Sequence, residues 1–377
     1  MKPHGFPAGR GARVGPDFSL KSQIPGLKIR EFMVYVPGGS DKSAIMNKER
    51  EIRGRFAPSP TGPLHLGNAM TFLVAWLSVR SRGGRIVMRI EDIEGHGRDP
   101  AVIEGNCRDL LRLGLEWDEG YRAGGPHGPY RQSERAELYR RALDRLLEQE
   151  LVYPCVCSRR DARQAGAAPH AGDCRMYDGR CRGRFADYAE AARALAGSGR
   201  LPAWRFRVPD REVVFRDRLC GGQRVNPALT YGDFPIARHP DGIGYQLAVV
   251  TDDIDMRITE VVRGGDLLEC TPWQILLYRA LAPEFPLPEF CHLPVVTGAD
   301  GKRLAKRTGS LTLESLFERG VRPGTVLGLL AFWGGWAEFG EELTLPELLE
   351  RFDLSALRGR KPCLDGPRPS SSSHPGK

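Results

Sequence analysis

The stretch from Arg55 to Asn68 has the composition of a loop that binds an anion. Its fourteen residues include three prolines, two glycines and one histidine, His65, and an apolar segment follows it. Prolines and glycines oppose a regular strand or helix, so the backbone can approach a small ligand closely. The following segment predicts a helix over about 68–80, whose N-terminus offers partial positive charge and N–H donors. The pattern therefore predicts a site for nucleotide phosphates.

A second cationic segment lies far along the chain, with four Lys or Arg side chains between 302 and 307. Alone, such a run is most often a solvated basic loop. Together with the His65 segment it predicts a mobile loop that closes over ATP phosphates and supplies positive charge from Lys306. The protein would then act by positioning the reactants and stabilising charge.

The two segments resemble the signatures of class I aminoacyl-tRNA synthetases, in the version found in glutamyl enzymes. Residues 65–68 are similar to the HIGH signature, and 303–307 to KMSKS, with Arg303 and Ala305 where the family usually has Lys and Ser. Arginine keeps the charge but presents a planar fork. Two motifs in this order, roughly a Rossmann-domain length apart, are specific together. The resemblance implies that His65 and Lys306 are catalytic, and that ATP, with Mg²⁺, is bound by His65, Gly67, Asn68, Arg303 and Lys306.

The same resemblance implies glutamate as the amino-acid substrate. The family's glutamate-binding positions match Arg55, Phe56, Ala57, Pro58, Ser59, Glu91, Tyr245 and Arg263. A carboxylate suits the substrate ammonium, while guanidinium groups and a phenol suit its two carboxylates. From the residues alone, an ion pair of Glu91 with an arginine and a core position for Tyr245 are favoured. The resemblance favours the binding site instead.

A cluster of thiols in the middle of the chain has the spacing of a tetrahedral zinc site. The chain has nine cysteines, and without a secretion signal a disulfide framework is not expected. The pattern resembles the C-x-C and Y-x3-C site of the glutamyl-queuosine tRNA(Asp) synthetase family, which implies the ligands Cys155, Cys157, Tyr177 and Cys181. Ligand chemistry alone favours Cys174 over a phenolate, so Cys174 stays the alternative. The predicted reaction needs no zinc-bound water, so we expect a structural zinc.

Strand and helix patterns predict an α/β chain of the Rossmann type with an insertion and a short C-terminal helical segment. The predicted strands are 52–57, 85–90, 204–208, 213–215, 244–250 and 293–297, and the predicted helices are 68–80, 103–113, 135–150, 267–281 and a few within 313–336 and 343–352. The expected domains are 53–154 and 241–310 as the two Rossmann halves, 155–240 as the zinc-containing insertion, and 311–377 as helices with a disordered tail.

Residues 1–52 hold nine basic and five acidic side chains and are expected to be a poorly ordered extension. Met33 and Met46 are alternative starts. No apolar run approaches a membrane span, and no signal-peptide core is present, so we expect a cytoplasmic protein. We also expect a monomer. His96, His127, His239 and His292 have no recognisable partner pattern and are assigned no role.

The resemblance covers roughly 53–309, and only 71 residues (377 − 306) follow Lys306. Full glutamyl-tRNA synthetases continue there with a large anticodon-reading domain. The family with the shorter C-terminal part activates glutamate without tRNA and esterifies it to the queuosine at the wobble position of tRNA(Asp). A net charge of +8 is compatible with an RNA partner. Two alternatives stay open: a truncated glutamyl-tRNA synthetase that charges the tRNA 3′ end, and an inactive paralogue that binds tRNA.

Overall fold

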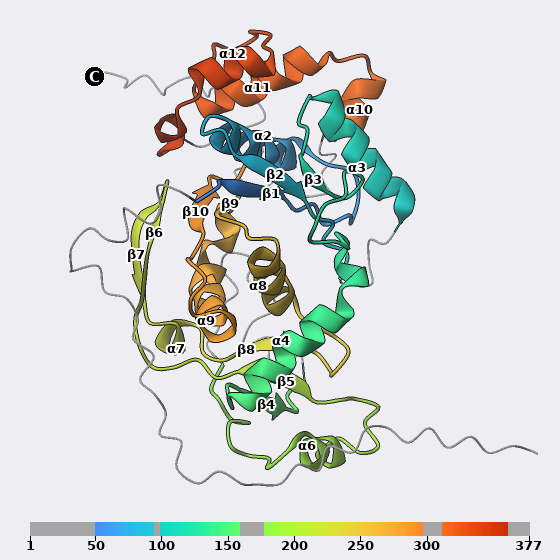
Figure 1. The fold of residues 1–377 in the computed structure, drawn as a ribbon, viewed down its shortest axis with the longest axis vertical. Coiled ribbons are helices and arrows are strands. Elements are labelled where there is room, and N and C mark those ends of the chain that lie inside the picture. The colour runs from blue at the N-terminus through green and yellow to red at the C-terminus, as the bar shows by residue number, and fades with distance from the viewer. Residues whose placement is uncertain (1–49, 94–98, 159–176, 297–310, 361–377) are drawn as a thin grey trace, which may run out of the picture. The chain divides into compact units, whose positions relative to one another are not determined.

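A computed structural model describes residues 50–93, 99–158, 177–296 and 311–360 (Figure 1). The chain divides into two compact units, Met1–Gly39 and Ser40–Lys377, and every described residue belongs to the second. The predicted extension therefore lies outside the described residues except at its last three positions. Within the described ranges, no helix has the length and apolar character needed to cross a membrane.

The first half of the unit is a parallel sheet of order β1-β2-β3 with helices in its crossovers. Its elements are β1 (Arg53–Phe56), α2 (Leu66–Arg80), β2 (Arg85–Met88), α3 (Pro100–Arg112) and β3 (Glu119–Gly120). All four residues of β1 are buried, which is typical of a parallel strand covered on both faces. The predicted strands near 53 and 85 and the predicted helix after His65 are confirmed.

The middle of the chain contributes to two different sheets. Strands β4, β5 and β8 form an antiparallel sheet, whereas β6 and β7 form an antiparallel pair beside β10. The elements are η1 (Gln132–Glu134), α4 (Ala136–Glu148), β4 (Val152–Cys155), α6 (Tyr188–Ala194), β5 (Ala203–Phe206), β6 (Val213–Asp217), β7 (Gly221–Val225), α7 (Pro227–Thr230) and β8 (Phe234–Ala237). β4 and β8 both pair with β5. Because β4 begins at Val152, this sheet begins before residue 155, the predicted start of the insertion.

The second parallel half places β9 next to β1. Its elements are α8 (Tyr245–Asp255), β9 (Glu260–Gly264), η2 (Gly265–Cys270), α9 (Thr271–Leu281) and β10 (Glu289–Leu293). β10 pairs in parallel with β9 and, at Phe290 and Asp217, with β6. The Thr259 N–H donates to the Arg53 carbonyl at 2.8 Å, so the two parallel sheets meet where β1 lies alongside β9. The α/β fold with a parallel sheet is thus confirmed.

The predicted strand over 244–250 is wrong, because these residues begin the helix α8. Its residues from Gln246 to Asp253 are all buried, so the helix has no exposed polar face. This run therefore lacks the three-to-four-residue spacing of apolar positions that marks an amphipathic helix. Such a run cannot be distinguished from a buried strand by periodicity. Gly244 stands before the first turn as the N-cap.

Two boundaries late in the chain also differ from the prediction. The last strand covers Glu289–Leu293 rather than 293–297, because Pro294 cannot donate to a strand ladder. The predicted helix over 267–281 consists of the 3-10 helix η2 followed by α9, and Pro272 occupies the first turn of α9, where its missing N–H costs nothing.

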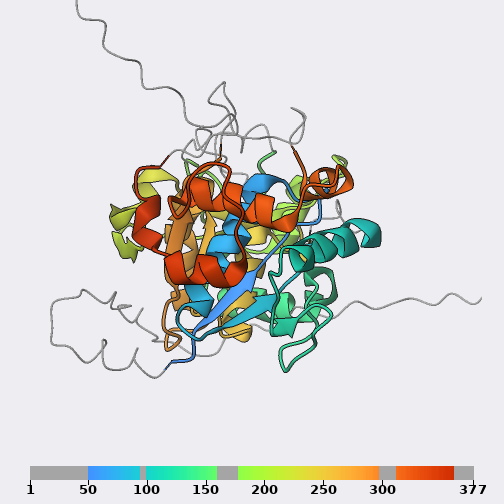
Figure 2. The same cartoon turned by 90° about the horizontal axis from the view of Figure 1, so that it is seen from above.

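Short helices at the C-terminal end cover α2. They are α10 (Leu313–Glu318), α11 (Pro323–Gly334), α12 (Leu345–Arg351) and the 3-10 helix η3 (Leu354–Leu357). Leu330 and Leu348 belong to the same buried cluster as Leu73 and Leu77 of α2. Figures 1 and 2 both show this layer lying against α2 on the side away from α8 and α9. The layer therefore holds α2, and the loop before it, against the sheet.

A single fully buried cation joins the two halves beneath the strand ends. The Arg89 guanidinium, 0% exposed, donates to Asp253 at 2.7 Å and to Glu91 at 3.0 Å, and lies 3.6 Å from Asp252. Burial opposes its charge, but the three carboxylates outweigh burial and hold the pKa of Arg89 well above its ordinary value. Asp252 in turn accepts a hydrogen bond from Arg135 at 2.7 Å.

Replacing Arg89 by methionine should lower the free energy of unfolding by about 3–5 kcal/mol, because Glu91 and Asp253 would lose a hydrogen-bonded cation and Asp252 would keep only the Arg135 cation. Urea denaturation at neutral pH measures this loss. Arg85→Met, at the start of β2, is the control, since the Arg85 side chain is exposed and its ion pair among the described residues is with exposed Glu51. It should cost less than about 1 kcal/mol. Equal losses for the two variants would contradict the role assigned to Arg89.

Candidate active site

His65 is the N-cap of α2, and its side chain takes part in a capping box. Its Nδ1 accepts from the Asn68 backbone N–H at 3.2 Å, and the Asn68 Oδ1 accepts from the His65 N–H at 3.2 Å. Because Nδ1 is an acceptor, the ring hydrogen of the neutral imidazole is on Nε2. The first turn of α2 contains no acidic residue, so its partial positive charge is not offset locally. The arrangement suits an anion.

Gly67 gives the imidazole the space to fold over the first turn of α2. A Cβ at this position would lie 3.0 Å from the His65 Cε1 and 3.1 Å from its Nδ1. It would also lie 3.8 Å from the Cβ of Val296, which follows β10. A side chain at 67 would therefore push the ring away from its cap.

The predicted ATP ligands Arg303 and Lys306 lie outside the described residues, which resume at 311. The chain on both sides of that gap lies beside the His65 loop. Val296 packs into the buried cluster that contains Leu66, and Thr312 forms an antiparallel bridge with His65. The Leu313 N–H donates to the Leu64 carbonyl at 2.8 Å.

Three of the predicted glutamate-binding side chains stand where parallel strands end. Arg55 is the third residue of β1, Arg263 the fourth of β9, and Glu91 follows β2 by three residues. Tyr245 is the first residue of α8. The charges of Glu91, Arg263 and Arg55 all act on the Tyr245 phenol, and burial together with Glu91 raises its pKa. The structure thus brings these four side chains together, at the sheet end where α/β folds bind ligands.

Arg55 is a buried cation whose charge is poorly compensated. It is 6% exposed, and its Nη1 donates to the Val262 carbonyl at 2.8 Å. Its Nε lies 3.8 Å from Asp253, and no hydrogen-bond acceptor for this Nε exists among the described residues. Burial lowers the pKa of Arg55, and the attraction of Asp253 only partly offsets this. A buried guanidinium whose charge is only partly compensated would be stabilised by a bound anion.

Glu91 is tied to both neighbouring parts of the site. Its backbone N–H donates to the Pro58 carbonyl at 3.0 Å, and its carboxylate accepts from Arg89 at 3.0 Å. Burial raises the pKa of Glu91 in spite of the attraction of Arg89 and Arg55. The backbone of Glu91 is thus fixed to the Pro-rich loop, and its carboxylate is held by Arg89 just beyond the end of β2.

The remaining members of the predicted loop differ in what they can offer. Phe56 is fully buried and its ring packs edge-on against Phe72 at 5.3 Å between centroids, so only its backbone can face a ligand. Pro58 is buried, Ala57 is half-buried and Ser59 is exposed.

Sequence reasoning missed the residues that hold these side chains in place. Arg89 is separated from Glu91 by one residue, so the two share one face of an extended segment, which was a usable signal. His292, which received no role, accepts a hydrogen bond from the Arg263 Nε at 2.9 Å. Asp252 and Asp253 lie on α8, just beyond the predicted strand over 244–250, and received no role.

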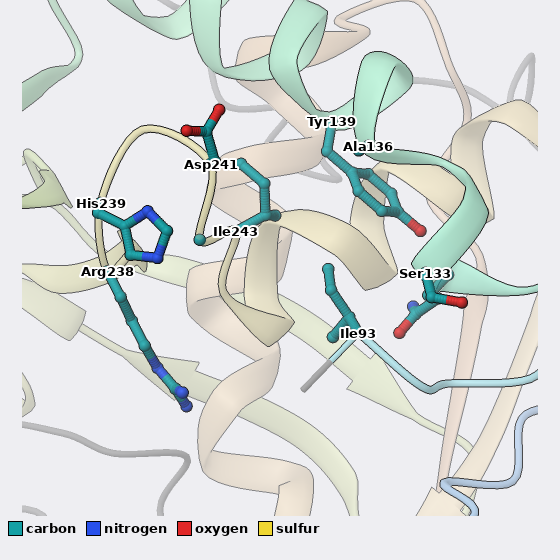
Figure 3. Close-up of a pocket in the computed structure, with 10 residues that line it drawn as sticks. Ile93, Ser133, Ala136, Tyr139, Arg238, His239, Asp241 and Ile243 are labelled. Atoms are coloured by element: carbon teal, nitrogen blue, oxygen red, sulfur yellow. The ribbon is translucent and has the colours of Figure 1, made fainter. Parts of the chain in front are cut away.

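A pocket of about 270 Å³ opens beside the first turn of α8 (Figure 3). The turn before α8 faces α4 and the residues ahead of it across this pocket. The side chains lining it include Ile93, Ser133, Tyr139, Arg238, His239 and Asp241. Both hydroxyls of this lining already have partners, since Ser133 donates to Asp92 at 2.7 Å and Tyr139 to Asp252 at 3.0 Å, so we assign the pocket no ligand.

The three predicted cysteine ligands and Tyr177 also meet in the structure. The Tyr177 hydroxyl lies 3.3 Å from the Cys155 sulfur and 3.5 Å from the Cys157 sulfur, and the Cys157 and Cys181 sulfurs are 3.6 Å apart. Tetrahedral zinc with ordinary bond lengths sets S···S at about 3.8 Å and S···O at about 3.5 Å. The three distances are close to these values, and the three sulfurs lie within 4.8 Å of one another, so the cluster is compatible with one zinc ion. The alternative ligand, Cys174, lies outside the described residues.

Arg205, on the strand beside β4, supports this cluster. Its Nε donates to the Cys155 sulfur at 3.2 Å, and its guanidinium lies 3.8 Å from the centre of the Tyr177 ring. Burial would raise the pKa of the Cys155 thiol, but Arg205 and the Tyr177 hydroxyl outweigh it and the pKa is lowered. Burial raises the pKa of Cys157 to about 12. One sulfur of the cluster is thus already biased toward the thiolate that binds metal.

The fold and the site define the class of protein. The family model of the class I tRNA synthetases (E and Q), catalytic domain, matches residues 51–358. The chain belongs to this family, and it is therefore a ligase of the class I synthetase type.

Individual relatives are more specific. The chain is 49% identical over 306 residues to a glutamyl-Q tRNA(Asp) synthetase of Symbiobacterium thermophilum, covering 81% of this chain and 93% of that protein. It is 46% identical over 285 residues to the enzyme of the same name from Nitratidesulfovibrio vulgaris, covering 75% of this chain and 86% of that protein. A crystal structure of a glutamate tRNA ligase from Elizabethkingia meningosepticum, in complex with its amino acid, is 28% identical with a TM-score of 0.69, covering 83% and 67% of the two chains.

Replacing Gly67 by alanine should lower the rate of amino-acid activation at least tenfold, because the added methyl group would displace the His65 ring from its cap. ATP–pyrophosphate exchange measures this rate. Gly105→Ala is the matched control, since Gly105 is also helical and a Cβ there meets nothing nearer than 3.7 Å. Equal rates for the two variants would show that the imidazole position does not matter.

Proposed function

We propose that this chain activates glutamate with ATP to glutamyl-adenylate, without tRNA, and then transfers glutamate to the queuosine at the wobble position of tRNA(Asp). The observation that carries the proposal is the buried Arg55 guanidinium, which lacks a full counter-charge and stands beside Glu91 and Tyr245. An amino acid with two carboxylates and one ammonium matches this set of charges. The names of the two most similar relatives reported above support the same substrate and acceptor.

Each binding group has a chemical role in this proposal. Arg55 and Arg263 supply N–H donors for the substrate carboxylates, which bind guanidinium forks strongly. Glu91 accepts from the ammonium, and the Tyr245 hydroxyl contributes a further hydrogen bond. The loop Phe56, Ala57, Pro58 and Ser59 borders the amino acid mainly with its backbone.

The ATP phosphates are assigned to the start of α2. The Nε2–H of His65, the backbone N–H of Gly67 and the side-chain amide N–H of Asn68 would face them. Lys306 and Arg303 are assigned to the same phosphates. Lys306 is six residues from Thr312, which pairs with His65, so an extended chain keeps it within about 20 Å of that residue.

The proposed chemistry has two steps that balance in atoms and charge. A carboxylate oxygen of glutamate attacks the α-phosphorus of ATP, the bond to the β-phosphate oxygen breaks, and pyrophosphate leaves. A hydroxyl of the cyclopentene diol of queuosine then attacks the activated carbonyl carbon, loses its proton, and AMP leaves. In the first step the cationic side chains offset the charge that develops on the phosphates.

The purified protein should catalyse ATP–pyrophosphate exchange that depends on glutamate and proceeds without tRNA. Arg55→Gln should lower kcat/KM for glutamate by about a hundredfold or more, because the substrate carboxylate would lose its buried cationic partner. The KM for ATP should stay nearly unchanged. Exchange with labelled pyrophosphate, with aspartate and glutamine as competing substrates, measures both effects. Absence of exchange with any amino acid would favour the inactive, tRNA-binding alternative.

The acceptor is tested separately with labelled glutamate, ATP and total tRNA, followed by digestion to nucleosides. Label on the queuosine nucleoside supports the proposed acceptor. Label on the terminal adenosine would instead support the truncated glutamyl-tRNA synthetase. Transfer RNA that lacks queuosine is the matched control and should accept no label.

We also propose that Cys155, Cys157, Tyr177 and Cys181 hold one structural zinc ion. The tetrahedral spacing of their donor atoms and the position of Arg205 support this assignment. When bound, the metal would fix the end of β4 to the chain around 177–181. No step of the proposed reaction uses it.

The purified protein should contain one zinc ion per chain, and Cys181→Ser should lose it, because a structural site needs all four ligands. Elemental mass spectrometry measures the metal content. Cys220→Ser is the control, since Cys220 is exposed and lies outside the cluster. A wild-type protein without zinc, or a Cys181→Ser variant that retains it, would contradict the assignment.

A further inference from the structure

The Arg263 guanidinium is fixed by three side chains at once. Its Nε donates to the His292 Nε2 at 2.9 Å, its Nη1 to the Gln274 Oε1 at 2.7 Å, and its Nη2 to the Thr271 Oγ1 at 2.8 Å. A guanidinium has five N–H donors, so two remain, one on each terminal nitrogen. All four residues are at most 4% exposed. The plane of the guanidinium is therefore set by protein groups before any ligand arrives.

His292 can accept from Arg263 in only one neutral form. Arginine only donates, so the His292 Nε2 must be without hydrogen, and the ring hydrogen must be on Nδ1. His292 lies directly opposite Arg263 in the register of the parallel strands β9 and β10, which brings the two side chains to the same face. Burial lowers the pKa of His292 to about 4, so the ring is neutral at physiological pH.

Asp217 imposes this form of the ring. Its Oδ2 lies 2.6 Å from the His292 Nδ1 and accepts the hydrogen. Its Oδ1 accepts from the backbone N–H groups of Leu219 and Cys220 at 2.9 and 2.8 Å, so the carboxylate cannot rotate freely. Burial would raise the pKa of Asp217, but these hydrogen bonds outweigh it and the pKa is lowered. A charged acceptor thus faces Nδ1 and leaves Nε2 for Arg263.

We propose that His292, oriented by Asp217, is a positioning residue that sets the guanidinium plane of Arg263 and so directs its two remaining N–H groups at a carboxylate of the amino-acid substrate. The inference rests on the proposed function, because it assumes that Arg263 contacts that carboxylate. His292 itself touches no reactant. Its action is to hold the Arg263 Nε–H and so to keep the fork from turning about the side chain.

Two replacements of His292 separate positioning from simple packing. Leucine removes the acceptor and leaves the Arg263 Nε–H buried without a partner, whereas glutamine keeps an amide oxygen that can accept near the position of Nε2. His292→Leu should weaken glutamate binding about 10- to 100-fold, the range for losing one hydrogen bond to a charged group. His292→Gln should recover most of this loss. The KM for ATP should stay within about twofold in both.

The experiment combines calorimetric titration of glutamate, without ATP, with ATP–pyrophosphate exchange on the full chain. Thr271→Val is a second variant, because it removes the Nη2 acceptor of the same guanidinium and should weaken glutamate binding in the same way. His127→Leu is the matched control, since His127 hydrogen-bonds to Tyr130 and Arg135 through its backbone, and it should bind glutamate as the wild type does.

The outcomes distinguish this inference from the proposed function. Weaker glutamate binding in His292→Leu, with recovery in His292→Gln and an unchanged KM for ATP, supports the inference. Unchanged glutamate binding in His292→Leu overturns it, as does a parallel rise of both KM values together with a lower melting temperature. A wild-type chain that binds glutamate but gives no exchange would overturn the proposed reaction alone, and the titrations would still decide the role of His292.

Discussion

The buried charge of Arg89 is the constraint on which the arrangement of the site depends. This cation has no access to water and is compensated by Asp253, Glu91 and Asp252, which come from the end of β2 and from α8. A buried guanidinium and buried carboxylates are stable only when they meet with good geometry. The requirement therefore fixes the rotation of α8 relative to β2. It also places Tyr245, at the start of α8, and Glu91 on the same side of the sheet.

The proposed glutamate site shares one carboxylate, Asp253, with the Arg89 network. Asp253 accepts a hydrogen bond from Arg89 at 2.7 Å but stands 3.8 Å from Arg55, so the second guanidinium is left with a partial counter-charge. A protein that bound no anion there would gain stability by replacing Arg55 with an apolar side chain. The retained charge is a cost that a bound carboxylate would remove.

Local patterns predicted much of the fold, and long-range contacts account for what was missed. The loop before α2 and the strands near 53 and 85 carry strong local signals, and the cysteine spacing marked a cluster that the structure brings together. α8 was assigned wrongly because a helix buried on all sides has no visible periodicity. The role of His292 could not be found in the sequence, since its partners Arg263 and Asp217 are 29 and 75 residues away. Sequence spacing did not decide between Tyr177 and Cys174 as the fourth ligand, because it does not show which side chain the fold brings to the sulfurs.

The pairing of β6 with β10 has a consequence for any attempt to shorten this chain. β6 comes from the segment between the two parallel halves, yet it lies against the outer strand of the catalytic sheet. Excising that segment to obtain a minimal enzyme would strip β10 of its neighbour and expose unpaired N–H and C=O groups. Bare strands of this kind join other chains and aggregate. The β6–β7 hairpin thus covers the edge of the sheet. A shortened enzyme would need to retain this hairpin to stay monodisperse.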